Sequence, residues 1–112
     1  MARTANLSIF RGEDSTINFT AYTTDTGSTP QDITGWTLVF TVSEAPNSAT
    51  KLIQKTCSHL VDASGTFKAT ITPTDTNIQP GIYAWDVYRT DSDNVRCLGS
   101  GFFKIRSVSY KP

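Results

Sequence analysis

The residues of this chain that are able to do acid–base or nucleophilic chemistry are few. The 112 residues include one histidine and two cysteines. A Ser–His–Asp arrangement would have to use His59, and its neighbours Ser58 and Leu60 do not form the Gly-x-Ser-x-Gly turn of a serine hydrolase. We interpret His59 as a surface residue at the end of a strand. The sequence therefore predicts that the protein is not an enzyme.

The two cysteines, Cys57 and Cys97, lie far apart in the chain and form no Cys-x-x-Cys pair, so a zinc site is poorly supported. The first residues lack the apolar core and cleavage pattern of a secretory signal. The favoured interpretation is therefore two reduced, partly buried thiols. A disulfide needs Cα atoms within about 7 Å of each other, and the sequence leaves that question open.

Carboxylates gather only where turns are expected. The run Asp91-Ser92-Asp93-Asn94 resembles the start of a calcium-binding loop, but the glycine and the distal bidentate glutamate of such a loop are missing. A hairpin turn accounts for the same residues, because Asp and Asn side chains bond to nearby backbone. The sequence predicts no metal ion and no other cofactor.

Composition favours strands over helices. The β-branched and aromatic types number 44 residues, whereas Ala, Leu, Glu and Met together number 16. Ten basic residues balance ten acidic ones, so no net field attracts nucleic acid or an anionic membrane. No apolar run approaches the roughly 20 residues that span a bilayer.

Seven segments carry strand character, most with the alternation of half-buried strands, and turn-forming residues separate them. They cover residues 7–11, 16–22, 36–42, 51–57, 66–72, 82–89 and 95–106. A short helical turn is expected at 75–78. This spacing is typical of an all-β, immunoglobulin-like antiparallel β-sandwich of about seven strands. We assign residues 7–112 to this single domain and residues 1–6 to a flexible N-terminal arm.

Alternation also divides the side chains between the two faces of each strand. The aromatic side chains predicted to point inward are Trp36, Phe40, Phe67, Tyr83, Trp85 and Phe103. The apolar side chains predicted to point outward are Val39, Tyr88, Leu98 and Phe102. Their strands lie side by side in an immunoglobulin-type sheet, so they predict a protein-contact patch, helped by Arg3 in the arm. One alternative to a contact patch is that these are scattered surface residues. Another is a register shift in the last strand, where Gly99 and Gly101 indicate a bulge or bend.

Five stretches between residues 9 and 105 have an informative order and spacing. They are Arg11-Gly12-Glu13-Asp14, the segment from Gln31 to Val42, Thr72 to Thr76, Pro80 to Val87, and Arg89-Thr90-Asp91. Together they resemble the small immunoglobulin-like modules of tailed-bacteriophage particles, and in particular the N-terminal domain of phage baseplate upper proteins. Ile33, between Asp32 and Thr34, is expected to plug the end of the core. Tyr83 resembles the corner residue of this fold, whose hydroxyl bonds to nearby backbone.

The resemblance implies a non-enzymatic structural protein of a phage particle, made in the host cytoplasm and located in the virion. Capsid decoration, a head–tail role and a tail or baseplate accessory role all stay open. Baseplate upper proteins continue into long trimerising regions, whereas this chain stops at Pro112, which favours a stand-alone virion protein. The expected partners are other virion proteins, with a homo-oligomer left open and no nucleic-acid or membrane partner. The alternative is a carbohydrate or host-surface binding module that uses Tyr22 and Tyr88 to stack on a sugar ring.

Overall fold

Nearly all of the regular structure is β-strand. The computed structural model describes residues 3–24, 27–45, 50–91 and 95–107, with the side chain of Arg3 outside the described part. The elements are β1 (Arg3–Thr4), β2 (Leu7–Phe10), β3 (Ser15–Thr20), β4 (Leu38–Ser43), β5 (Lys51–Thr56), β6 (Ser58–Val61), a 3₁₀ turn (Asp62–Ser64), β7 (Thr66–Ile71), α1 (Pro73–Thr76), β8 (Gly81–Arg89) and β9 (Arg96–Arg106).

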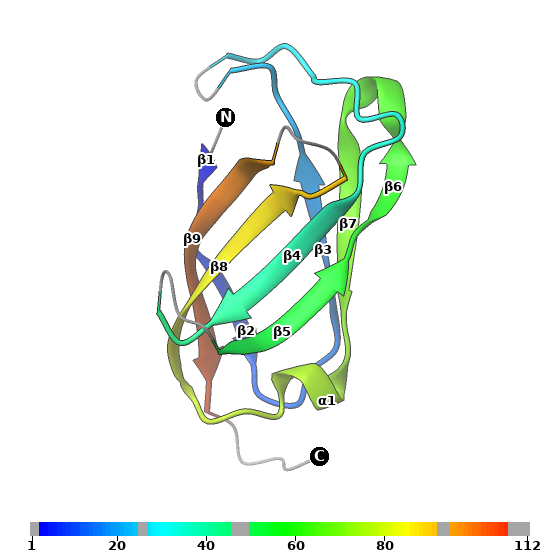
Figure 1. Cartoon of the computed structure of the whole chain (residues 1–112). Helices are drawn as coiled ribbons and strands as arrows, with labels where there is room; N and C mark the ends of the chain where they lie inside the picture. The colour runs from blue at the N-terminus through cyan, green and yellow to red at the C-terminus, as the bar shows by residue number, and fades with distance from the viewer. Residues whose placement is uncertain (1–2, 25–26, 46–49, 92–94, 108–112) are drawn as a thin grey trace.

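The strands form two sheets that face each other as the layers of a sandwich (Figure 1). One is six-stranded, in the order β1-β9-β8-β4-β5, with β2 also paired to β9. The other is three-stranded, in the order β3-β7-β6. At the centre of the larger sheet, β8 pairs antiparallel with both β4 and β9. The predicted all-β class is confirmed.

The structure corrects the expected set of seven antiparallel strands. Strand β6 follows β5 directly, with Cys57 alone between them, and β1 falls inside the expected arm. Both β1 and β2 run parallel to β9. A short hairpin would force its two strands to be antiparallel, whereas the long stretch of chain between β2 and β9 permits a parallel pair. The Ala5 N–H also donates to the Ser100 carbonyl at 3.0 Å. Residues 3–6, which the sequence assigned to a flexible arm, therefore lie along β9.

Some expected features fall where the structure gives no description. These are residues 1–2 of the arm, residues 92–94 of the hairpin turn and residues 108–112 of the domain. The expected helical turn at 75–78 is found two residues earlier, as α1. Thr72 caps this helix, because its hydroxyl accepts from the Asp75 N–H while the Asp75 carboxylate accepts from the Thr72 N–H.

A cluster of five aromatic rings fills the space between the sheets. Phe19 and Phe67 come from the three-stranded sheet, and Phe40, Trp85 and Phe103 come from the six-stranded sheet. Ring centroids lie 5.2 Å apart for Phe19 and Phe67 and 5.6 Å apart for Phe19 and Trp85. These separations are those of favourable tilted or offset aromatic pairs. The four members predicted to point inward are all buried.

Two other residues predicted to point inward, Trp36 and Tyr83, are half-buried against this core. Trp36 precedes β4, and the Arg89 guanidinium lies 4.1 Å from its ring centroid. The Tyr83 hydroxyl donates to the carbonyl of Gln79, which is the backbone bond expected for a corner residue. Ile33 is fully buried, as expected for a plug.

The N-terminal strand is held by a specific contact with the core. The Trp85 indole N–H donates to the Ala5 carbonyl at 2.9 Å. Gly101 lies beneath that carbonyl, and a Cβ atom at this position would come within 1.8 Å of the Ala5 oxygen. A side chain at 101 therefore excludes Ala5 from its place, and only glycine permits the strand to dock so closely.

We predict that Gly101→Ala destabilises the protein by about 1–3 kcal/mol, because the added methyl group forces Ala5 away from β9. Urea unfolding measures the loss, and hydrogen exchange locates it at the Ala5 amide. Gly81→Ala is the matched control, since a Cβ there would meet its nearest atom at an ordinary 3.9 Å. Equal stability of the two variants would contradict the prediction.

We also predict that Trp85→Ala costs about 3–5 kcal/mol of unfolding free energy, because it leaves a cavity among the aromatic rings. Trp85→Phe keeps most of the packing and removes the indole donor, so it costs only about 0.5–1.5 kcal/mol. Denaturant unfolding of each variant measures its loss of unfolding free energy. An unchanged melting temperature in Trp85→Ala would show that this ring is not central to the core.

Candidate functional site

The outer face of the six-stranded sheet carries a group of exposed apolar side chains. Trp85 and Val87 of β8 point into the core, so the residues that alternate with them point outward. The most exposed large side chains here are Ile82, Tyr88 and Phe102, with exposed fractions of 63%, 38% and 57%. We call the surface formed by Ile82, Tyr88, Phe102, Val39 and Asp86 the outer face.

Three of the predicted contact residues come together on this face. Val39 pairs with Tyr88 between β4 and β8, and the two line one groove of about 280 Å³. Phe102 pairs with Ala84 between β8 and β9. Tyr88 and Phe102 line a second groove, of about 410 Å³. The structure therefore brings Val39, Tyr88 and Phe102 to one side of the sheet.

The prediction for Leu98 is wrong, because this side chain points into the core. It is 8% exposed and lies near Phe19 and Trp85. The reason is a register shift between β8 and β9, where Val87 pairs with Gly99 but Tyr88 pairs with Cys97. Leu98 is the extra residue of this bulge, so the alternation reverses there. The side chain of Arg3 lies outside the described part, and its backbone pairs with Gly99.

Two residues of the outer face were not singled out from the sequence. Ile82 lines a third groove, of about 400 Å³, together with Phe102 and Lys104. Asp86 lines both of the grooves that Tyr88 lines. The sequence pattern could have identified both residues. The alternation that places Tyr83 inward also places Ile82 and Asp86 outward.

The outer face holds one carboxylate, Asp86, and its grooves also contain the lysines Lys51 and Lys104. Burial raises the pKa of Asp86, and the charge of Lys51 opposes this rise. The pKa of Tyr88 is raised by Cys97, by burial and by the charge of Asp86. Burial also raises the pKa of Cys97, whose thiol donates to the Gly99 carbonyl at 3.3 Å. The shifts of Tyr88 and Cys97 both favour the protonated forms of these two groups.

His59, predicted to lie at the surface, makes structural contacts while 28% of its side chain stays exposed. Its ring is half-buried, with Nδ1 2.6 Å from a carboxylate oxygen of Asp62 and Nε2 2.7 Å from the carbonyl of Trp36. The bond to Trp36 joins β6 to the segment that precedes β4, and the bond to Asp62 joins β6 to the 3₁₀ turn that follows it. Both ring nitrogens are engaged in this contact.

Cys57 and Cys97 are both free thiols in the structure. Burial raises the pKa of Cys57 to about 12, so it behaves as a small apolar core residue. Within the described ranges, no group of three or more His, Cys, Asp or Glu side chains is placed to hold a metal ion. None of the described helices has the length and apolar character to cross a membrane.

Comparison of the sequence with protein-family models and with curated proteins finds no match. Tyr22, the other tyrosine considered for sugar stacking, forms an isolated bridge with Pro30. It lines neither of the grooves that Tyr88 lines.

We predict that Asp86→Asn raises the melting temperature at pH 7. The folded-state pKa of Asp86 lies above the ordinary value of 3.8, so folding disfavours its charged form, and the stability of the natural protein falls as the pH rises through this range. Asparagine carries no charge at any pH. The difference in melting temperature between the variant and the natural protein should therefore shrink as the pH falls below 3.8, where the carboxyl group of Asp86 is protonated in both the folded and the unfolded chain. Thermal unfolding at a series of pH values measures it.

Asp32→Asn is a matched control of opposite sign. The hydroxyl and the N–H of Thr34 lower the pKa of Asp32, so its charged form stabilises the fold at neutral pH. This variant should therefore lose stability at pH 7 and recover the difference in acid. A destabilised Asp86→Asn at pH 7 would contradict the prediction for the outer face.

Proposed function

We propose that this chain is a non-enzymatic structural protein of a bacteriophage particle that binds neighbouring virion proteins through the outer face. One observation carries the protein-contact part of the proposal: Ile82, Tyr88 and Phe102 are exposed on two hydrogen-bonded strands, and Phe102 shares one groove with Ile82 and another with Tyr88. Single exposed apolar residues are common on any surface, whereas a contiguous group that includes two aromatic rings is typical of a protein interface.

The physical setting of these side chains favours tight contact. They project from the sheet's central strand β8 and its neighbour β9, so little backbone freedom is lost when a partner binds. Tyrosine and other aromatic residues contribute most of the binding energy in many interfaces. The charge of Asp86 lies beside Tyr88 and orients a partner that brings a basic group.

The phage setting rests on the resemblance of sequence, and the local structure bears on the fold that this resemblance implies. The corner bond of Tyr83, the buried plug Ile33 and the capped turn at Thr72 all lie in the stretches that carry the resemblance. The strand order supports an immunoglobulin-like assignment, since β3, β7 and β6 form one sheet while β4, β8 and β9 form the core of the other.

A carbohydrate or host-surface binding role is the second candidate. The groove of about 410 Å³ sets Tyr88 and Phe102 beside the polar side chains of Asn6, Asp86 and Ser100. Aromatic rings flanked by hydrogen-bonding groups also suit a sugar. Three exposed apolar side chains make a protein surface the better match.

We predict that the double variant Tyr88→Ser, Phe102→Ser folds normally but incorporates into phage particles at least about tenfold less, because it removes the two aromatic anchors of the outer face. Thermal unfolding tests the fold, and quantitative mass spectrometry of purified particles tests incorporation. Leu60→Ser is the control, since Leu60 is exposed on β6 of the other sheet.

Full incorporation of the folded double variant would show that the outer face is not the contact surface. Absence of the natural chain from particles would reject the virion role. A glycan array then tests the carbohydrate-binding role. That role requires that the natural chain binds a glycan and that the double variant does not.

A further inference from the structure

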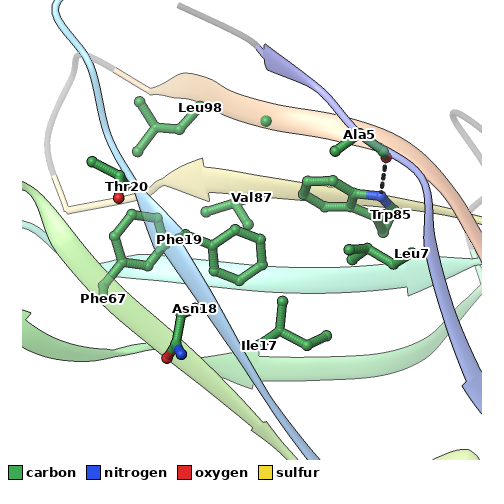
Figure 2. Close-up of a pocket in the computed structure, with 11 residues that line it drawn as sticks. Ala5, Leu7, Ile17, Asn18, Phe19, Thr20, Phe67, Trp85, Val87 and Leu98 are labelled. Atoms are coloured by element: carbon green, nitrogen blue, oxygen red, sulfur yellow. Dashed lines mark hydrogen bonds between the residues drawn. The ribbon is translucent and has the colours of Figure 1, made fainter. Parts of the chain in front are cut away.

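A cleft of about 200 Å³ lies between the two sheets at the side where β3 faces the N-terminal strand (Figure 2). The cleft is distinct from the outer face, since none of the residues that line it belongs to that face. Trp85, Val87 and Leu98 line its inner part, and Ile17, Phe19 and Leu7 lie nearer its mouth. The last three remain only half-buried although they point toward the core. This side of the sandwich therefore leaves apolar surface in contact with water.

The backbone at the mouth of the cleft has an open edge. Strand β3 pairs with β7 on one side, and no described strand pairs with it on the other. The N-terminal segment does not close this edge, because its strands β1 and β2 both pair with β9. On the opposite side of the sandwich, the chain itself crosses between the sheets through the buried Cys57.

The pairing register shows which groups face the open edge. The Ala21 N–H donates to the Gly65 carbonyl, which makes this a hydrogen-bonded pair in the register that also aligns Phe19 with Phe67. Hydrogen-bonded and non-hydrogen-bonded pairs alternate along an antiparallel ladder. The backbone groups of Asn18 and Thr20 therefore point away from β7, and both residues lie at the cleft.

We propose that this open edge of β3 and the cleft beside it form a second docking site, which takes an extended strand from a partner protein. The added strand pairs with the backbone of Asn18 and Thr20, and every second side chain enters the cleft. Strand addition of this kind combines backbone bonds for affinity with pockets for alternate side chains for specificity.

The uncharged lining of the cleft determines which side chains it can accept. None of the eleven residues that line it carries a charged side chain. A charge placed in such surroundings would lose its water without gaining a partner. The partner strand must therefore carry neutral apolar side chains at its inward positions, while its outward positions are free to be polar.

The test uses the intact chain and a short synthetic peptide that alternates threonine with valine and ends in two lysines for solubility. Two-dimensional NMR follows the amides of Asn18 and Thr20 and the indole of Trp85. We expect saturable shifts at these groups, with the Trp36 indole as an internal reference outside the site. A peptide with aspartate in place of valine should not bind.

Asn18→Pro removes the donor at the open edge without touching a bond to β7, and Asn18→Thr is the matched control that keeps it. We expect about tenfold weaker binding for the proline variant than for the threonine variant. If the proline variant does not fold, valine peptides that are N-methylated on the edge facing β3 give the same comparison with the natural chain.

Equal binding of the valine and aspartate peptides, or of the two Asn18 variants, would overturn the proposal. So would the absence of any shift at millimolar peptide. Shifts at Asn18 and Thr20 that appear without peptide as the protein is concentrated would identify a second copy as the occupant. Shifts with toluene but not with the valine peptide would make the cleft a small-molecule pocket. Either of these last two results also rejects a partner strand.

Discussion

The hydrogen bond from the Trp85 indole to the Ala5 carbonyl joins the N-terminal strand to the centre of the aromatic core. Trp85 contacts Phe19 of the facing sheet and Phe40 of its own sheet, so one side chain connects both layers and the first residues of the chain. Glycine at position 101 is what permits this approach, because any Cβ there would occupy the place of the Ala5 oxygen. With the N-terminal strand held on β9, the edge of β3 stays open, and the rim of the grooves on the outer face includes Thr4 and Asn6.

The described histidine and several aspartate side chains form contacts that hold loops in place. His59 joins β6 to the segment before β4, and Asp75 caps a helix and pairs with Lys55 at 2.9 Å. Asp91 accepts from the Thr37 N–H and from Arg89. These bonds fix the ends of the sandwich, where the connections would otherwise be free to move. The outward side chains of the strands are held in place by the ladder beneath them. A rigid apolar face is suited to binding another protein surface.

The two surfaces described here differ in the kind of partner that they fit. The outer face offers side chains from strands that are already paired, an arrangement that suits a folded surface placed against Tyr88, Phe102 and Ile82. The edge of β3 offers backbone groups and a cleft, which suit a chain segment that is extended. The two lie on different sides of the larger sheet, since one is formed by its outward residues and the other by its inward ones. A particle protein with both would contact one neighbour by its face and another by a strand.

The sequence by itself determined the features that depend on local alternation. Phe40, Phe67, Trp85 and Phe103 were assigned to the core, and Val39, Tyr88 and Phe102 to the outside, because residues two apart in a strand share a face. Leu98 was misassigned because a bulge depends on how β9 aligns with β8, and no periodicity within one strand reports that alignment. The pairing of the N-terminal residues was missed for the same kind of reason. Arg3 and Thr4 have a partner that is almost a hundred residues away, and only the tertiary structure brings β9, Gly101 and the Trp85 indole together to hold them.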